Sequence, residues 1–101
     1  MSDQLAGLDP VHPGEILRED VIPATRLSKT AFATRLGLSR EALHNILACR
    51  SAISPLTALK LSRLRGTSPE MWLNLQQAFD LARTRKERAR GLDRIEELAQ
   101  A

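Results

Sequence analysis

Residues 29–47 read Lys29-Thr-Ala-Phe-Ala-Thr-Arg-Leu-Gly37-Leu-Ser-Arg-Glu-Ala-Leu43-His-Asn-Ile-Leu47, and this stretch decides the fold. The hydroxyl of Ser28 can cap a helix over residues 31–36, and Gly37 suits the left-handed position that follows a helix end. Ser39 can cap a second short helix that runs from Arg40 to Leu47 or Ala48. The stretch therefore predicts two short helices joined by a three-residue turn.

Two such helices pack only if certain positions are small or apolar. Ala33 is small where the helices cross, and Leu38 is expected to insert the turn into the core. Leu43 and Ile46 are spaced to face inward from the second helix, where they would meet Phe32 and Leu36. A plain helical hairpin with a glycine turn would explain the leucines but not the polar outward face. The pattern thus predicts a helix-turn-helix motif.

A helix that enters the major groove of DNA presents polar side chains outward. Arg40, Glu41, His44 and Asn45 are the candidates for contact with base edges, and residues 28–30, Arg35 and Arg50 for contact with phosphates. The alternatives are that Ser28 only caps its helix and that Arg35 and Arg50 are solvated. The complete candidate DNA-binding set is Ser28, Lys29, Thr30, Arg35, Ser39, Arg40, Glu41, His44, Asn45 and Arg50.

The charge distribution agrees with this location. Residues 1–25 carry a net charge of −4, whereas residues 26–50 carry +4. A polyanion would therefore be attracted to the second quarter of the chain rather than to the chain as a whole.

Outside this stretch, the pattern predicts three longer helices and a tail. His12-Pro-Gly-Glu15 opens a first helix that Pro23 is expected to end, because proline cannot continue the backbone hydrogen bonds. Ser54-Pro55 starts a helix that ends at Gly66, and Ser68-Pro69 starts the longest helix, which can run to about Arg90 before Gly91. Leu92, Ile95 and Leu98 suggest a last amphipathic tail helix.

Composition favours an all-α protein of one compact domain. The 101 residues are 43% hydrophobic, mainly Leu and Ala, with only three aromatic residues. The single Cys49 cannot form an intramolecular disulfide, and no apolar run approaches the roughly 20 residues that cross a bilayer. A cytoplasmic protein without membrane association is expected.

Two distant histidines and one cysteine do not make a metal site, and no catalytic or phosphate-binding motif is present, so neither a cofactor nor an enzyme is expected.

The chain from His12 to about Arg83, about 70 of its 101 residues, resembles the HigA family of antitoxins within the Cro/repressor (XRE) type of helix-turn-helix proteins. The resemblance is carried by the helix-turn-helix stretch and by His12-Pro-Gly-Glu-Ile-Leu-Arg-Glu19, Ala52-Ile-Ser-Pro55, Ala58-Leu-Lys-Leu61 and Gly66-Thr-Ser-Pro-Glu-Met-Trp-Leu-Asn-Leu-Gln76. It implies a five-helix, lambda-repressor-like domain with a C-terminal helical extension. It also implies a homodimer that represses its own operon by binding double-stranded operator DNA, and that neutralises a RelE-like, HigB-type ribonuclease toxin.

Two features depart from the family pattern. Members usually end the recognition helix with an Asn-Gly-Arg or Asn-Gly-Lys turn, whereas this chain has Ala48-Cys49-Arg50. The helix is therefore expected to extend or to end without a glycine cap. Glu41 and Ala42 stand where neutral residues such as Gln and Thr are common, which leaves the operator sequence open.

The expected organisation is an N-terminal arm over residues 1–11, a DNA-binding domain over 12–80 and a helical extension over 81–101. The residues expected at a twofold dimer interface are Trp72, Leu75, Phe79, Leu92, Ile95 and Leu98, although residues 72–79 also fit a core. Acidic residues of the first quarter could dock a basic toxin or could simply form a solvated face: Asp3, Asp9, Glu15, Glu19 and Asp20.

Two other functions fit the same pattern less well. A stand-alone XRE-type transcription regulator would need no toxin, but His12-Pro-Gly-Glu15 and the segment around Trp72 favour the antitoxin. A protein-binding module that no longer reads DNA would not need the polar, basic recognition face.

Overall fold

The N-terminal helix is continuous through a proline. In the computed structural model, which describes residues 9–99, it comprises α2 (Pro13–Ile16), a π-helical turn η1 (Leu17–Val21) and α3 (Ile22–Thr25). The prediction that Pro23 ends this helix is wrong. The N–H of Ile22 donates to Leu17, five residues back, and this wider turn relieves the clash that a proline ring makes in an ordinary α-helix. The helix ends instead at Arg26, whose φ is 62°.

The helix-turn-helix prediction is confirmed. Ser28 caps α4 (Lys29–Leu36), and Ser39 caps α5 (Arg40–Leu47). Gly37 has a φ of 79°, the left-handed conformation that the turn requires. The turn is closed by the N–H of Leu38, which donates to the carbonyl of Ala33 at 2.9 Å.

Two capped helices follow, as predicted, but the C-terminal end differs. Ser54 caps α6 (Pro55–Arg65), which ends at Gly66, and Ser68 caps α7 (Pro69–Glu87). The long helix breaks at Arg88, and α8 (Ala89–Asp93) runs through Gly91, so Gly91 is not a helix end. Residues 95–98 are not helical, which corrects the predicted tail helix. A short amphipathic helix with nothing to pack against is marginal in water.

A single apolar core joins these helices. Phe32, Ala33 and Leu36 from α4 meet Leu43 and Ile46 from α5, as predicted, and Leu38 is only partly buried against them. Leu47 of α5 is also buried. The remaining buried core residues come from the N-terminal helix, the α5–α6 loop, α6 and α7, and they are Leu17, Ile22, Ile53, Ala58, Leu61 and Trp72.

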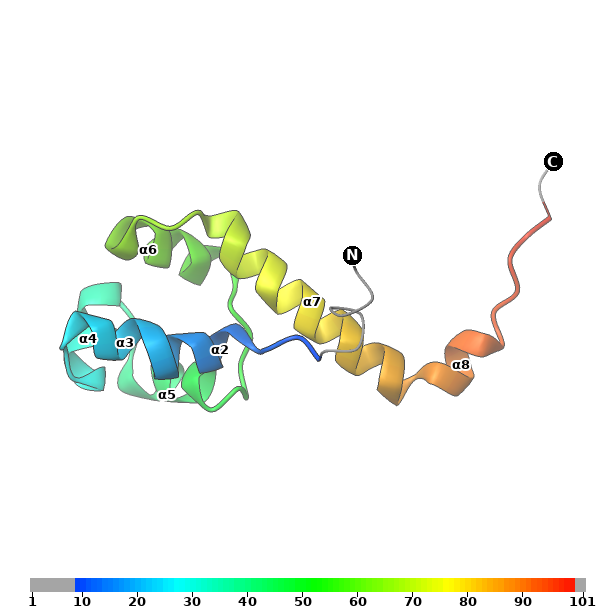
Figure 1. Cartoon of the computed structure of the whole chain (residues 1–101), viewed down its shortest axis with the longest axis horizontal. Coiled ribbons are helices and arrows are strands. Elements are labelled where there is room, and N and C mark those ends of the chain that lie inside the picture. The colour runs from blue at the N-terminus through cyan, green and yellow to red at the C-terminus, as the bar shows by residue number, and fades with distance from the viewer. Residues whose placement is uncertain (1–8, 100–101) are drawn as a thin grey trace.

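The all-α expectation is confirmed over residues 9–99, which contain helices and no strand. Figure 1 shows α2 to α6 gathered in one body, while α7 starts against α6 and runs obliquely out of it towards α8. The molecule is elongated, with principal extents of 55 × 29 × 25 Å. Within the described residues, no helix has the length and apolar character needed to cross a membrane.

Candidate nucleic-acid interface

The two serine caps orient the predicted DNA-binding face. Ser28 Oγ accepts a hydrogen bond from the N–H of Ala31 at 3.0 Å, and Ser39 Oγ accepts one from the N–H of Ala42, also at 3.0 Å. Because these caps satisfy only one N–H each, further N–H groups at both helix starts remain available to an anion. The hydrogen bond at the start of α4 also shows that Ser28 caps its own helix, which was the alternative to a phosphate contact.

Most of the predicted contact residues lie outward. Asn45 is half-buried, and the exposed members are Ser28, Lys29, Thr30, Arg35, Ser39, Arg40, Glu41, His44 and Arg50. Lys29, Arg40 and His44 come together around a shallow hollow of about 60 Å³ whose floor is Leu43 and Leu47. The N-terminus of α4 and the recognition helix α5 therefore present one continuous polar and basic face.

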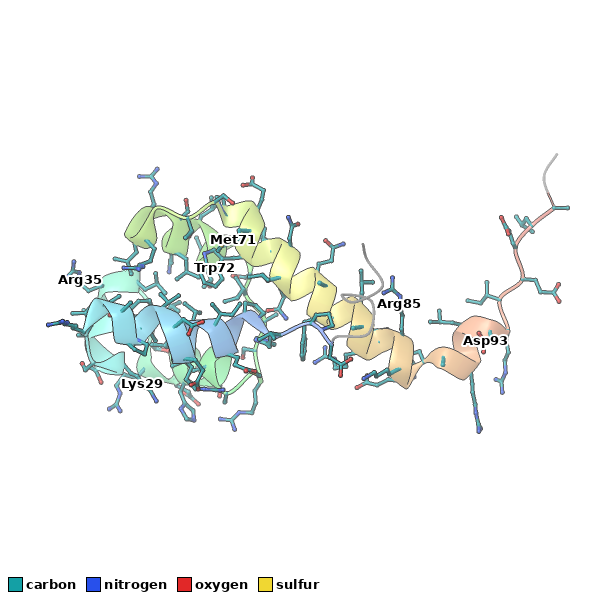
Figure 2. All side chains as sticks on the ribbon, in the orientation of Figure 1. Lys29, Arg35, Met71, Trp72, Arg85 and Asp93 are labelled. Carbon is teal, nitrogen blue, oxygen red and sulfur yellow. The ribbon has the colours of Figure 1, made fainter. Side chains whose placement is uncertain are left out.

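Arg35 lies apart from this face. Figure 2 shows Lys29 on the side of α5, whereas Arg35 projects from the far end of the body. Its neighbours there are Leu64 and Arg65 of α6, together with Leu27. A phosphate contact by Arg35 would require the duplex to reach a second side of the domain.

The segment after α5 is held against the recognition helix. Arg50 Nη2 donates to Asn45 Oδ1 at 3.2 Å, and the N–H groups of Arg50 and Ser51 both donate to the Asn45 carbonyl. The helix ends at Leu47 without a glycine cap, as expected from the departure from the family pattern. Cys49 adopts a φ of 62°, a left-handed conformation that is unfavourable for a residue with a side chain. Asn45 and Arg50, predicted as separate contacts, therefore act as one unit.

The N-terminal helix positions α5, which the sequence reasoning missed. A Cβ atom on Gly14 would overlap the carbonyl oxygen of Ile46, so the two backbones approach closely only because residue 14 is glycine. Arg18 Nη1 donates to the carbonyl of Leu47 at 2.7 Å, at the C-terminal end of α5, where a cation is favourable. Glu19 accepts from Arg18 Nε at 2.8 Å and raises the pKa of the guanidinium. The signal available in the sequence was a glycine in the first turn of a helix.

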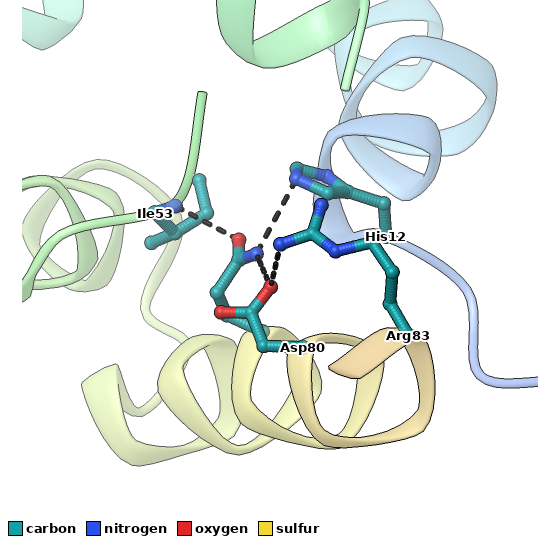
Figure 3. Close-up of polar contacts among 5 residues, drawn as sticks. His12, Ile53, Asp80 and Arg83 are labelled. Atoms are coloured by element: carbon teal, nitrogen blue, oxygen red, sulfur yellow. Dashed lines mark hydrogen bonds and ion pairs between the residues drawn. The ribbon is translucent and has the colours of Figure 1, made fainter. Parts of the chain in front are cut away.

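A polar network ties the same N-terminal helix to α7 (Figure 3). Gln76 Oε1 accepts from the N–H of Ile53 at 2.9 Å, and Gln76 Nε2 donates to Asp80 Oδ1 at 3.1 Å and lies 3.4 Å from His12 Nε2. Arg83 Nη2 lies 3.5 Å from Asp80 Oδ1. Because Ile53 lies in the loop after α5, the network fixes that loop relative to α7.

His12 is a structural residue. Its Nδ1 accepts from the N–H of Gly14 at 2.9 Å, and its ring packs edge-on against Phe79 with centroids 5.0 Å apart. Burial lowers the pKa of His12, since desolvation disfavours the imidazolium, and the Arg83 charge lowers it further. The Asp80 charge and the Ser51 carbonyl oppose this shift. His12 and Gln76 are buried polar residues that sequence periodicity alone did not identify as core.

The residues predicted at the dimer interface divide into two groups. Trp72 is only 1% exposed, and its Nε1 donates to Thr67 Oγ1 at 2.8 Å, so it belongs to the subunit core and not to an interface. Leu75 and Phe79 are half-buried. Ile95 and Leu98 are 73% and 87% exposed, and Leu92 is also exposed. A second subunit can therefore contact the exposed and the half-buried members of the predicted set, but not Trp72.

The acidic residues of the first quarter of the chain do not form one surface. Glu15, Glu19 and Asp20 are exposed on the N-terminal helix, whereas Asp9 pairs with Lys86 of α7 at 3.2 Å. Asp3 lies outside the described residues, as do residues 1–8 of the predicted arm.

Several known proteins are similar to this chain in sequence over about 70% of its length. No protein-family model matches it. Over 71 residues it is 41% identical to virulence-associated protein I of Dichelobacter nodosus, covering 70% of this chain and 66% of that protein. Over 76 residues it is 34% identical to antitoxin HigA-1 of Vibrio cholerae, covering 75% of this chain and 71% of that antitoxin.

The solved structures extend the similarity to almost the whole chain. Antitoxin GraA superposes with a TM-score of 0.85 at 40% identity, over 91% of this chain and all of GraA. GraA in complex with its operator gives a TM-score of 0.83 at 39% identity, over 93% and 96% of the two chains. Pseudomonas aeruginosa antitoxin HigA with the higBA promoter gives 0.82 at 33% identity, over 89% and 99%.

Proposed function

Because the chain belongs to the HigA family of antitoxins, with an XRE-type helix-turn-helix, we propose that it binds the operator of its own operon as a dimer and neutralises a RelE-like ribonuclease toxin. The observation that carries the DNA-binding part is the single face on which Lys29, Arg40 and His44 surround one shallow hollow. Two proteins of the same fold, GraA and Pseudomonas aeruginosa HigA, have been solved with their operator or promoter.

The proposed mechanism assigns α5 to the major groove. Arg40 would donate to guanine and Asn45 would pair with adenine, while Glu41 would accept from the amino group of cytosine. Lys29 and the free N–H groups at the start of α4 would hold a phosphate, which fixes the register of α5 on the duplex. Arg50 would hold Asn45 in place from the side, since their side chains are hydrogen-bonded.

A dimer would present two such faces. Operators read by helix-turn-helix dimers have half-sites about 34 Å apart, so the two α5 helices need a fixed spacing. The exposed surface of α7 and the segment that follows it is the proposed contact, through Leu75, Phe79, Leu92, Ile95 and Leu98. The support for this choice is that these apolar side chains are only half-buried or exposed in one subunit.

The proposed toxin-docking surface is the acidic side of the N-terminal helix, Glu15, Glu19 and Asp20. All three are exposed, and a basic toxin would complement their charge. Charge reversal at the three positions should weaken toxin binding. Reversal at Glu15 and Asp20 alone, which keeps the Glu19 pair with Arg18, should also leave operator binding intact. Unchanged toxin affinity would show that this helix is only a solvated face.

A stand-alone regulator is the second candidate. The similarity that favours this candidate is to YddM, an HTH-type transcriptional regulator of Escherichia coli. The two chains are 36% identical over 78% of the length of YddM. The identity of the neighbouring gene distinguishes an antitoxin from a stand-alone regulator. A short reading frame for a basic protein, immediately upstream, supports the antitoxin, and its absence supports the stand-alone regulator.

The DNA-binding proposal is tested by titrating the chain against its own upstream DNA and against random DNA at several salt concentrations. Lys29→Ala should weaken binding to both DNAs and reduce the salt slope by about one. Arg40→Ala or Asn45→Ala should cost about 1 to 3 kcal/mol on the specific site and relax sequence preference. Equal losses on both DNAs from all three variants would contradict this division of roles. Repeating the titration with the neighbouring gene's product tests the link between toxin and repression.

A further inference from the structure

A basic groove lies at the C-terminal end of α6, away from the DNA-binding face. Two hollows of about 360 and 350 Å³ adjoin there and share Arg35 and Leu64 in their walls. Arg65 and Leu27 line the first hollow, and Arg63, Lys60 and Leu36 line the second. We call this continuous surface the basic groove.

The groove is cationic with an apolar floor. Arg35, Arg63 and Arg65 are exposed, and across residues 9–99 none of them has a carboxylate within ion-pair distance. Lys60 Nζ donates to the carbonyl of Gly37 at 3.0 Å, which keeps a fourth positive charge at the edge. The half-buried Leu64 supplies apolar surface between these charges. The groove therefore suits a segment that carries both carboxylates and aliphatic side chains.

This chain contains such a segment, residues 93–98, which we call the acidic tail. It reads Asp93-Arg-Ile-Glu-Glu-Leu98 and has a net charge of −2. Ile95 and Leu98 are the most exposed large apolar side chains among the described residues. The tail is thus acidic and apolar where the groove is basic and apolar.

The acidic tail does not lie near the groove of its own subunit. Figure 1 shows α4 and the C-terminal segment at opposite ends of the molecule, whose long extent is 55 Å. The groove of a second copy is the complementary surface that remains.

An antiparallel pair of α7 helices would bring the acidic tail of one subunit close to the basic groove of the other. The C-terminal end of each α7 would lie beside the start of the other, next to the end of α6 that carries Arg63 and Arg65. The exposed stripe of α7 suits such a pair, because the small Ala78 lies midway between Met71 and Arg85, which Figure 2 shows towards opposite ends of the helix. A contact centred on one residue is self-complementary, as a twofold axis requires. The five residues 95–99, which follow α8 and its turn at Arg94, add a reach of about 16 Å when extended.

We propose that, in the dimer, the acidic tail of each subunit docks in the basic groove of the other. This inference rests on the proposed dimer and identifies a contact that holds its two subunits together. In a polyproline II conformation, whose period is three residues, Ile95 and Leu98 share one side and cover the leucine floor, while Glu96 and Glu97 pair with Arg63 and Arg65. The exchange is reciprocal, so the assembly stops at two subunits.

Sedimentation equilibrium of the full chain without DNA tests this contact by charge exchange. The variants are Arg63→Glu with Arg65→Glu, Glu96→Lys with Glu97→Lys, and all four together. Each double variant should raise the dimer Kd about tenfold or more, because attraction becomes repulsion. The fourfold variant should return to within about threefold of the wild type. The matched control, Lys29→Glu with Arg40→Glu, makes the same charge change on the α5 face and should leave the dimer Kd unchanged.

The other outcomes overturn the inference in distinguishable ways. If the double variants leave the dimer Kd unchanged, or if the fourfold variant does not recover, the acidic tail does not dock in the groove and the dimer is held elsewhere. If groove reversal leaves the dimer intact but weakens toxin binding, the groove accepts an acidic segment of the toxin. If the wild type is monomeric at high micromolar concentration, the proposed dimer itself fails. Circular dichroism confirms that the substitutions, all at exposed positions, leave the helices intact.

Discussion

The two halves of α7 have the same secondary structure in opposite environments. In residues 69–76 the helix is fixed by packing, with Trp72 in the core and Gln76 bonded to the loop that follows α5. In residues 81–87 it projects from the body, and almost every side chain is exposed. The first half therefore stabilises the DNA-binding body, while the second offers surface to another molecule. Helical pattern alone does not separate these roles, because a helix can continue beyond its core as long as its residues favour helix.

The largest expected effect contrasts the core with the acidic tail. Trp72→Ala should lower the free energy of unfolding by about 3 to 5 kcal/mol, since a large aromatic side chain leaves a cavity that the core cannot refill. Leu98→Ala, at an exposed position, should change it by less than about 0.5 kcal/mol. Urea denaturation of both variants at low protein concentration measures the difference. Similar losses in the two would mean that the tail packs on its own subunit.

A smaller effect is expected where α2 meets the recognition helix. Gly14→Ala should lower the free energy of unfolding by about 1 to 3 kcal/mol, because the added methyl group meets the backbone of Ile46. It should also weaken specific more than non-specific DNA binding, since α5 must shift. Gly91→Ala is the matched control, because a Cβ there meets nothing. It should be neutral or more stable by about 0.5 to 1 kcal/mol, and a destabilised Gly91→Ala would contradict the open position of α8.

The smallest effect is a pH dependence from His12. Its pKa in the folded protein lies below the usual 6.5, so the folded state binds a proton less readily than the unfolded state does. The stability that this provides is present above about pH 6.5 and is lost as the pH falls towards the folded-state pKa. His12→Asn keeps a side-chain cap for Gly14 but cannot titrate. Thermal melts between about pH 7.5 and 5.5 should therefore show a steeper loss for the wild type than for the variant, and equal slopes would rule out the histidine as the source.

Much of the fold could be predicted from residues 12–69 because each helix start carries its own local signal. A serine hydroxyl bonded to a nearby N–H marks the starts of α4, α5, α6 and α7, and glycine with a positive φ ends α4 and α6. These interactions join residues only a few positions apart. The outward position of Arg40 and His44 follows from helical periodicity, since the opposite face of α5 is apolar.

Only the tertiary structure decided which residues act together. Three contacts join segments that are far apart in the chain, and no local pattern encodes them. They are the approach of Gly14 to Ile46, the hydrogen bond from Arg18 to the Leu47 carbonyl and the hydrogen bond from the Ile53 N–H to Gln76. The same holds for Arg35, whose charge counts equally with that of Lys29 in the sequence but lies on another surface. The sequence predicts Trp72 at an interface for the same reason, because a helical stripe shows that a side chain is apolar but not whether its own subunit covers it. Local sequence thus specified the helices and their caps, whereas packing assigned each exposed or buried face its role.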